Sequence, residues 1–363
     1  MKKVLVGLSG GVDSAVTAYL LKEAGYDVTA GFMINYLDEN NPECPTKLDL
    51  QVAKEVAAYL NIPFFIFDYR ETYAEKVLDY MYEGYKKGIT PNPDIMCNSE
   101  VKFKVFLDEA LEHGFDMVAT GHYAIIERTP ILSPFPSEEK GELKYIYHLK
   151  KGVDPNKDQS YFLAGLNQFQ LSKALFPVGN MQKSEVREIA IKAGLPNATR
   201  KDSQGICFVG KVDMIKFLEQ KIEHKPGLVK DTSGKILGEH KGVFYYTIGQ
   251  RKGLDIGGQK EPIFVVKKDI KNNEIIVGTA NDLELFDDKL YVLDFNFLAK
   301  KDYVFPLKAK AKIRYRQEDQ DCTIYKEENI YKVVFDKKQR AIASGQICAI
   351  YLDDELIMSG VIN

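Results

Sequence analysis

A glycine-containing loop near the N-terminus is the first place where this chain could carry out chemistry. Ser9-Gly10-Gly11-Val12-Asp13-Ser14 follows an apolar run over residues 4–8 and precedes a helical pattern over residues 13–24. A strand that feeds such a loop into a helix leaves backbone N–H groups unpaired, and together with the serine hydroxyls they form a cradle for an anion. The loop has neither the lysine of G-x-x-x-x-G-K-[ST] nor the spacing G-x-G-x-x-G. A tight turn with Asp13 as the N-cap is the alternative.

Two cysteines lie in unusual surroundings. Cys97 ends T-P-N-P-D-I-M-C, in which two X-Pro steps hold the chain extended and present Asn92 and Asp94. Because a helix is predicted over residues 99–112, capped by Asn98 or Ser99, Cys97 is expected at its N-terminus, where the helix dipole favours a thiolate. Cys207 follows a turn-like stretch, K-D-S-Q-G-I. For either cysteine a buried apolar role is the alternative; it is also the interpretation of Cys322 and Cys348, whereas Cys44 is left open.

The elements that would position these residues alternate along the first half of the chain. Strand patterns over residues 4–8, 28–33, 63–67 and 117–120 alternate with helical patterns over 13–24, 49–60, 72–87 and 99–112. This order predicts an α/β fold with a parallel sheet covered by helices on both faces. Because ligands of such sheets bind at the carboxyl ends of the strands, the loop 9–14, Met33 and Gly121-His122 should meet in one crevice.

The remainder of the chain has a different texture. Residues 129–143 form an excursion rich in proline and charge, and a helix is predicted over 184–193. Beyond about residue 205 short strands dominate, with hairpin turns at 271–274 and 325–329. The predicted domains are a catalytic domain over 1–205, a small and mostly β central domain over 206–278, and a C-terminal barrel-like β domain over 279–363.

Composition limits the class of protein. The 363 residues are 45% hydrophobic and 28% charged, with a formal net charge of −3, so any surface for nucleic acid must be local. We expect no membrane segment and no signal peptide, because no apolar stretch approaches the roughly 20 residues of a transmembrane helix. Five scattered cysteines favour reduced thiols in a cytoplasm over a disulfide framework.

One local basic surface is indicated near the C-terminus. Five cations recur at every second residue: Lys308, Lys310, Lys312, Arg314 and Arg316. On a single strand they would point to one face and could follow a phosphate backbone. The alternative is an edge strand whose charges prevent aggregation.

The motifs together indicate a family. The loop S-G-G-x-D-S resembles the PP-loop of N-type ATP pyrophosphatases, which cleave ATP between the α- and β-phosphates. In order along the chain, T-P-N-P-D-x-x-C-N, A-T-G-H-Y, D-x-N-K-D-Q-S-Y-F-L, K-D-S-x-G-I-C-F and T-I-G-Q-R-K-G-L resemble the bacterial tRNA-specific 2-thiouridylase family. The resemblance runs nearly end to end, and Tyr36 stands where that family usually has tryptophan.

The resemblance implies a reaction. Mg²⁺ and ATP would serve to adenylate O2 of the wobble uridine in tRNAs for Lys, Glu and Gln, after which sulfur replaces the activated oxygen. Cys207 would carry a persulfide received from a donor protein, and Cys97 would be the second, nucleophilic thiol. Asp94 would act as a base or hold the uracil, which must leave its stack to be reached. Asp13 would orient the loop or help to hold Mg²⁺.

The resemblance also implies two sets of binding residues. Those implied for ATP are Gly7, Leu8, Ser9, Gly10, Gly11, Val12, Asp13, Ser14, Met33 and Gly121. Those implied for tRNA or the target base are Asn92, Pro93, Asp94, His122, Lys157, Asp158, Gln159, Arg314, Tyr315 and Gln346. A structural role for His122 is the alternative.

Three alternatives remain. Cys97 and Cys207, with Asp94 or Cys44, could instead ligate an iron–sulfur cluster, although no C-x-x-C pair is present. A PP-loop amide synthetase would also form an adenylate, but it would leave the two motif cysteines without a role. A non-catalytic RNA-binding protein would need neither the intact loop nor the cysteines. The sulfur donor and the oligomeric state are not indicated by the sequence.

Overall fold

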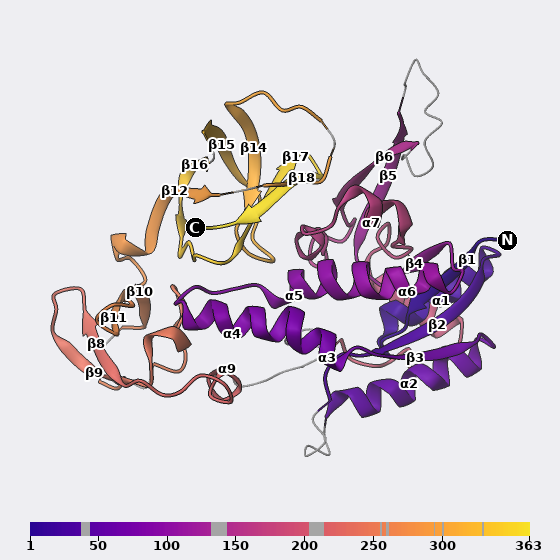
Figure 1. Ribbon diagram of the computed structural model, residues 1–363, viewed down its shortest axis with the longest axis horizontal. Coiled ribbons are helices and arrows are strands. Elements are labelled where there is room, and N and C mark those ends of the chain that lie inside the picture. Colours follow the sequence, from indigo (N-terminus) through magenta and orange to yellow (C-terminus); the bar gives the residue numbers. More distant parts are fainter. Residues whose placement is uncertain are drawn as a thin grey trace.

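The computed structural model describes residues 1–37, 44–131, 144–202, 214–254, 256–258, 261–293, 295–299, 301–328 and 330–363. Within these residues the N-terminal half forms a parallel sheet with helices, the middle forms a small sheet, and the C-terminal part forms a larger antiparallel sheet (Figure 1). This arrangement confirms the predicted fold class. In the described part of the chain, no helix is both long enough and apolar enough to cross a membrane.

The parallel sheet has the strand order β3-β2-β1-β4-β7. Its strands are β1 (Lys3–Gly7), β2 (Asp27–Ile34), β3 (Phe64–Asp68), β4 (Met117–Ala119) and β7 (Ala174–Leu175). Central β1 is buried on both faces, which is why its sequence is an unbroken apolar run. Val4 and Val6 point into one hydrophobic core and Leu5 into another.

The helices divide between the two faces of this sheet. The core that contains Val4 and Val6 also contains residues of α1 (Val12–Glu23), α2 (Pro45–Tyr59) and α8 (Lys183–Lys192). The opposite core holds a helical series made of α3 (Arg70–Tyr73), π-helical η1 (Ala74–Leu78), α4 (Asp79–Lys86), α5 (Pro93–Met96), π-helical η2 (Cys97–Val105) and α6 (Phe106–Glu112). Further along lie 3₁₀-helical η3 (Ser160–Leu163) and α7 (Gln168–Lys173).

The helix that carries Cys97 begins earlier than predicted. Asn92 is its N-cap and accepts a hydrogen bond from Ile95 N at 3.2 Å, and Pro93 occupies the first helical position. The predicted start at Asn98 or Ser99 was therefore wrong, because the Asn-Pro pair had been interpreted as extended chain only. Cys97 lies inside the helical run, and the expected placement at a helix N-terminus is corrected.

The C-terminal sheet also includes two strands from the N-terminal half of the chain. Its order is β12-β16-β15-β14-β17-β18-β6-β5, with β13 pairing to β18. The hairpin of β5 (Ala124–Pro130) and β6 (Tyr145–Lys151) comes from the N-terminal half. The other strands are β12 (Phe286–Val292), β13 (Asn296–Phe297), β14 (Leu307–Lys312), β15 (Gln320–Glu327), β16 (Ile330–Arg340), β17 (Ile347–Leu352) and β18 (Glu355–Val361). The 3₁₀-helical turn η5 (Leu283–Leu285) precedes β12.

The basic residues at 308–316 do not form the predicted stripe. β14 ends at Lys312, and the chain then turns through Arg314 and Arg316, whose φ is +62°. The prediction that all five cations point to one face of a single strand was therefore wrong. The edge-strand alternative is also wrong, since β14 pairs with β15 on one side and β17 on the other. Lys308 and Lys310 are exposed, whereas Lys312 is only 12% exposed and pairs with Asp158.

The central sheet has the order β10-β11-β8-β9. Its elements are α9 (Met214–Leu218), β8 (Gly227–Asp231), β9 (Ile236–His240), 3₁₀-helical η4 (Val243–Tyr245), β10 (Ile263–Asp269) and β11 (Glu274–Thr279). β10 and β11 pair antiparallel, and β15 pairs likewise with β16. Both pairings confirm the hairpins predicted from their turns at 271–274 and 325–329.

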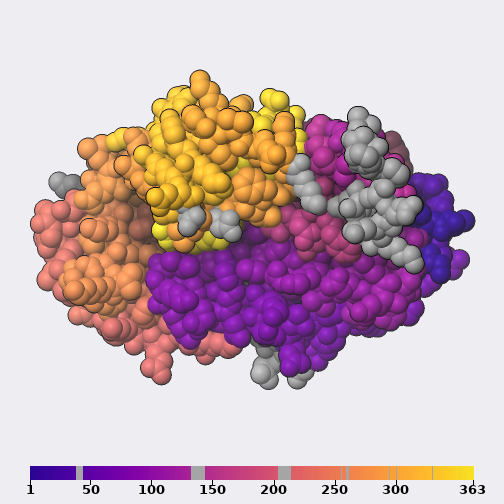
Figure 2. All heavy atoms as spheres, turned by 45° about the horizontal axis from the view of Figure 1, so that its top comes forward, coloured from indigo at the N-terminus to yellow at the C-terminus, as the bar shows by residue number. Residues whose placement is uncertain are grey.

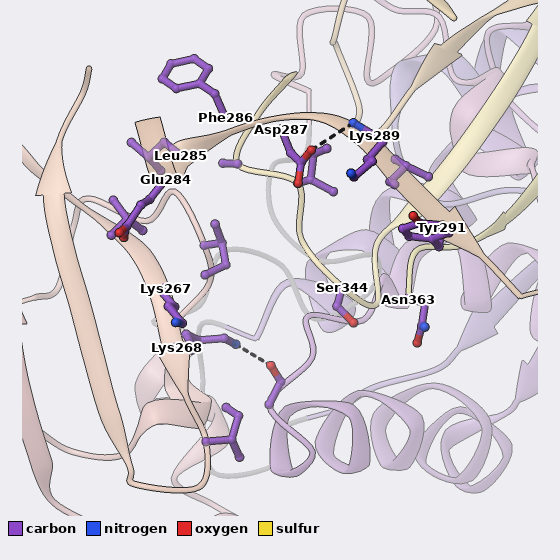
Figure 3. Close-up of a pocket in the computed structure, with 17 residues that line it drawn as sticks. Lys267, Lys268, Glu284, Leu285, Phe286, Asp287, Lys289, Tyr291, Ser344 and Asn363 are labelled. Atoms are coloured by element: carbon purple, nitrogen blue, oxygen red, sulfur yellow. Dashed lines mark hydrogen bonds between the residues drawn. The ribbon is translucent and has the colours of Figure 1, made fainter. Parts of the chain in front are cut away.

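A cavity of about 450 Å³ lies where the three regions meet (Figure 3). Lys268 of β10 lies at its wall and donates hydrogen bonds to the carbonyl oxygens of Gly88 (2.6 Å) and Tyr246 (2.8 Å). Burial lowers the pKa of Lys268 to about 8. Figure 2 shows the C-terminal sheet lying directly against the helices of residues 70–112. The cavity is lined by none of the loop residues 9–14 and is not the candidate active site.

Candidate active site

The glycine loop forms the predicted strand–loop–helix. Gly11 is the N-cap of α1, and no side chain caps that helix among the described residues, so first-turn N–H groups remain directed at the loop. Ser9 and Ser14 fix the loop from within, since Ser9 N donates to Ser14 Oγ at 3.2 Å and Ser14 Oγ donates to the Gly11 carbonyl at 3.1 Å. The geometry is an anion cradle at a helix N-terminus.

Side chains from outside the loop hydrogen-bond to Gly10. Its carbonyl accepts hydrogen bonds from Asn197 Nδ2 at 2.9 Å and Arg200 Nη1 at 3.0 Å, and Arg200 also pairs with Asp49 at 2.5 Å. Burial raises the pKa of the Asp49 carboxyl, although its hydrogen bond from Arg200 opposes the shift. Gly10 has φ +78°, and a Cβ there would lie 2.6 Å from the Asp49 carbonyl oxygen, so only glycine fits.

The loop 9–14, Met33 and Gly121 lie together at the carboxyl ends of β1, β2 and β4. A Cβ on Gly7 would lie 3.2 Å from Met33 Cε, and one on Gly121 would lie 2.7 Å from the Asp13 carbonyl carbon. Loop, Met33 and Gly121 therefore converge as expected from the parallel topology. Leu8 and Val12 are buried beneath the loop, at 1% and 4% exposure.

Asp13 is the centre of a network that sequence reasoning missed. Its Oδ1 accepts hydrogen bonds from Tyr123 OH (2.7 Å) and Lys183 Nζ (2.5 Å). Lys183 also pairs with Asp202 at 2.9 Å, and Asp202 pairs with Lys157 and Arg187. Burial would raise the pKa of Asp202, but hydrogen bonds from Lys157 and Lys183 outweigh it and lower the pKa to about 2. One signal was available for Lys183: a lysine at the start of a helix opposes the helix dipole.

Cys97 is buried, with 0% exposure. The helical run that contains it ends before Gly114, and Asp116 N then bonds Lys3 O at the amino edge of the sheet. Since the helix runs antiparallel to the strands, its first turns, with Asn92, Asp94 and Cys97, lie on the carboxyl side of the sheet. Cys207 lies outside the described residues, as do most residues of the 129–143 excursion.

Gln346 holds the segment in front of this helix. Its Nε2 donates to the carbonyl oxygens of Thr90 (2.9 Å) and Pro91 (3.4 Å), and Thr90 N donates to Ser344 O at 2.8 Å. The C-terminal sheet thus fixes the T-P-N-P-D segment directly. Gln346 was predicted at tRNA; the contact that it makes in the structure is internal.

His122 lies in an aromatic setting. It is 8% exposed, its ring centroid is 5.9 Å from Phe103 and 5.7 Å from Phe176, and Nδ1 contacts Thr120 Oγ1 at 2.7 Å. Burial, and secondarily the charge of Lys102, holds the pKa of His122 well below its usual range. These contacts fit the structural alternative, and a role beside tRNA stays a prediction.

The turn Lys157-Asp158-Gln159 also makes internal contacts. Gln159 Oε1 accepts from Tyr123 N at 3.0 Å, which positions the tyrosine that bonds Asp13. Asp158 is 6% exposed and accepts from the backbone N–H groups of Gly152 and Ser160 as well as from Lys312. Contact of these residues with tRNA stays a prediction.

Arg314 and Tyr315 lie in the turn after β14. Arg314 Nη2 donates to the Arg340 carbonyl, and burial lowers the arginine's pKa, helped by the charge of Arg340. The Tyr315 ring packs on Phe162, with centroids 4.2 Å apart. Phe162 belongs to η3, so this turn lies against the N-terminal half of the chain.

The glycine loop has the groups that would hold the phosphates of ATP. The cradle at Gly11 and the serine hydroxyls fit a polyphosphate. Among the residues that the structure describes, no group of three His, Cys, Asp or Glu side chains could hold a metal ion. Because Cys207 is not among them, the iron–sulfur alternative stays a prediction. Asn35, which follows β2 at the same edge, is 1% exposed, and neither of its side-chain polar atoms has a hydrogen-bond partner in the described part.

A parallel sheet with an uncapped glycine loop at its carboxyl edge defines a nucleotide-binding α/β protein of the PP-loop class. Three family models match in order: a tRNA methyl transferase HUP domain over residues 2–211, a tRNA methyl transferase PRC-barrel domain over 215–279, and an aminomethyltransferase beta-barrel domain over 287–362.

Relatives match over the whole length. A tRNA-specific 2-thiouridylase of Shouchella clausii is 47% identical, with 99% of this chain and 96% of the relative covered. One of Christiangramia forsetii is 44% identical with both chains fully covered. A solved structure of the U34-tRNA thiolase NcsA from Methanococcus maripaludis with its [4Fe-4S] cluster is 18% identical, at TM-score 0.33, over 54% of this chain and 57% of that one. The chain belongs to the tRNA-specific 2-thiouridylase family, the tRNA sulfurtransferases.

Proposed function

We propose that this chain catalyses the ATP-dependent 2-thiolation of the wobble uridine in tRNAs of the Lys, Glu and Gln type. The observation that carries the proposal is the convergence of the anion cradle at residues 9–14 with Met33 and Gly121 at the carboxyl edge of the parallel sheet. The full-length similarity to tRNA-specific 2-thiouridylases supports the same substrate class. A cytoplasmic location is part of the proposal.

The chemistry proceeds in two displacements. Uracil O2 attacks the α-phosphorus of ATP, and the bond to pyrophosphate breaks, so that the oxygen becomes part of a good leaving group. The terminal sulfur of a Cys207 persulfide then attacks C2, and AMP leaves. Cys97 thiolate attacks Cys207 Sγ, which frees the thiocarbonyl and leaves a Cys97–Cys207 disulfide for an external thiol to reduce. In the variant of this scheme, Cys97 attacks the persulfide first and releases hydrosulfide as the nucleophile.

The residues have separable tasks in this scheme. The loop N–H groups and Ser9 and Ser14 would hold the pyrophosphate part of ATP, and the resemblance assigns Asp94 to the uracil. Mg²⁺, when bound with ATP, would neutralise phosphate charge, and Asp13 is the carboxylate in the loop that could hold it. Lys308 and Lys310, exposed on β14, supply cations for the tRNA backbone.

The test is formation of 2-thiouridine on unmodified glutamate tRNA, with Mg-ATP and a persulfide donor. We expect wild type to thiolate and Cys97→Ser and Cys207→Ser to fail, whereas Cys322→Ala, which removes a free thiol from the C-terminal core, keeps activity in the fraction that folds. Activity of Cys207→Ser with free sulfide would reduce Cys207 to a carrier.

The same preparations separate the alternatives. If anaerobically purified protein contains iron and labile sulfide, and activity is lost when they are lost, the iron–sulfur cluster scheme would be favoured over the persulfide scheme. ATP–pyrophosphate exchange without any thiouridine would favour an amide synthetase. Binding of tRNA without exchange would favour a non-catalytic RNA-binding protein.

A further inference from the structure

The start of α8 places a lysine beside the glycine loop. Gln182 caps the helix through a reciprocal pair with Glu185, in which Gln182 N donates to Glu185 Oε2 at 2.6 Å. Lys183 N donates to Asp154 Oδ2 at 3.0 Å. These bonds fix the backbone of Lys183, the first residue of α8, while its side chain extends toward α1.

The ammonium group lies between two carboxylates. Lys183 Nζ is 2.5 Å from Asp13 Oδ1 and 2.9 Å from Asp202 Oδ1, and the side chain is 12% exposed. Asp13 belongs to the first turn of α1, so the lysine lies next to two helix N-termini at once. A cation is disfavoured at such ends, because the unpaired N–H groups are themselves positive. Its place there favours a role with an anionic ligand.

Asp13 and Asp202 each keep another hydrogen-bond donor if the Lys183 ammonium moves away. Asp13 keeps the hydroxyl of Tyr123 at 2.7 Å. Asp202 keeps Lys157 Nζ at 2.5 Å and Arg187 Nη2 at 2.8 Å. The remaining donors therefore keep each of the two carboxylates hydrogen-bonded when the lysine moves. Lys183 is therefore the member of this network that can turn to a ligand.

We propose that Lys183 is the phosphate-binding lysine of this loop, supplied by a distant helix because S-G-G-V-D-S itself carries none. It contacts the β- and γ-phosphates of ATP and stabilises the negative charge that develops on the departing pyrophosphate. In this step the bond from uracil O2 to the α-phosphorus forms, the bond from that phosphorus to pyrophosphate breaks, and Lys183 stays protonated throughout. The inference rests on the proposed use of ATP at residues 9–14.

The test compares nucleotides that differ in the phosphates concerned. Lys183→Met, Lys183→Arg and wild type are titrated with the Mg²⁺ complex of α,β-methylene-ATP and with AMP, with and without unmodified glutamate tRNA. We expect Lys183→Met to weaken binding of the analogue at least 10-fold and of AMP less than twofold, and Lys183→Arg to recover part of the loss. Lys192→Met, at a 78% exposed lysine of the same helix, should match wild type.

The outcomes are distinct. Equal losses for the analogue and AMP, or a lowered melting temperature that accounts for both, would make Lys183 a structural ion pair and overturn the inference. Unchanged affinity for the analogue would overturn it as well, and so would a wild type that binds the analogue no better than AMP. A wild type that binds the analogue tightly but forms no thiouridine with any donor would refute the proposed function while the comparison at Lys183 still stands.

Discussion

The carboxylate of Asp13 joins the glycine loop to side chains that are far away in the sequence. Tyr123 reaches it from the segment after β4, and Lys183 from the start of α8. The loop residues themselves could be predicted because the motif is local. Their partners could not, because an ion pair between residues 170 positions apart depends on the path of the whole fold.

Adding one methyl group at Gly121 tests whether this residue lies at the nucleotide site. In Gly121→Ala the new Cβ would lie 2.7 Å from the Asp13 carbonyl carbon and 2.8 Å from Ser14 N, so the loop must shift. We expect at least a 10-fold loss of ATP affinity, measured by fluorescence titration. Gly238→Ala, where a Cβ meets nothing within 4 Å, should bind ATP as wild type does. Equal affinity in both variants would separate Gly121 from the nucleotide site.

His122 should make stability depend on pH. Its folded pKa lies below the unfolded value of about 6.5, so the unfolded chain binds more protons, and stability is lost as pH falls below 6.5. We expect urea unfolding of wild type between pH 7 and 5 to show a slope of up to about 1.4 kcal/mol per pH unit from this group, absent in His122→Gln. A His122→Gln slope equal to that of wild type contradicts a neutral, buried imidazole.

At the scale of elements, the sequence predicted which segments form strands and helices better than where they begin. The periodicity of 99–112 is apparent, but the helix extends back to Pro93 because Asn92 caps it. That cap, in an Asn-Pro pair, is a signal that could have been used. β14 shows the opposite limit, since alternation continues past Lys312 in the sequence whereas the strand does not. The turn can end the strand despite the alternating sequence because the Gln317 side chain supplies a hydrogen-bond acceptor for the backbone. Ile313 N donates to Gln317 Oε1 at 2.8 Å.

The contact between Gly345 and Thr90 can be tested by a substitution outside the proposed substrate-binding residues. Gly345 has φ +89°, and a Cβ there would lie 3.0 Å from the backbone of Thr90. We expect Gly345→Ala to displace the T-P-N-P-D segment and lower kcat for thiolation by about 10-fold or more. Gly234→Ala is a matched control, because its φ of +88° imposes the same strain but its Cβ meets nothing within 4 Å. If both variants lose the same activity, backbone strain alone explains the loss.

At the scale of the molecule, the N-terminal half and the C-terminal sheet share buried hydrogen bonds. Tyr161 OH donates to Ile347 O at 3.0 Å, Ser359 Oγ donates to Ala164 O at 2.6 Å, and β6 pairs with β18. The predicted boundaries at 205/206 and 278/279 treat the chain as consecutive domains. The pair of strands β5 and β6 crosses that division, which no local pattern indicates, because strand partners across about 200 residues are set by tertiary packing.

The ion pair of Lys312 with Asp158 allows the contribution of this interface to stability to be measured. Its ammonium pairs at 3.3 Å with Asp158, which is buried in the N-terminal half, so Lys312→Met leaves a buried carboxylate without its cation. We expect the free energy of unfolding to fall by about 3 kcal/mol, measured by urea denaturation, because breaking a buried pair from one side is costly. Lys310→Met, two residues along the same strand and exposed, should stay within about 0.5 kcal/mol of wild type.

The same two variants separate stability from tRNA binding. Lys310 is free to face a phosphate backbone, so Lys310→Met should weaken tRNA binding and reduce its salt dependence, while Lys312→Met should change binding only through unfolding. In a double cycle, Asp158→Asn should remove most of the cost of Lys312→Met, because the unpaired charge is gone. Additive losses in that cycle would mean that the contact between Lys312 and Asp158 contributes no coupling energy to stability, and would contradict this account of how the two halves are joined.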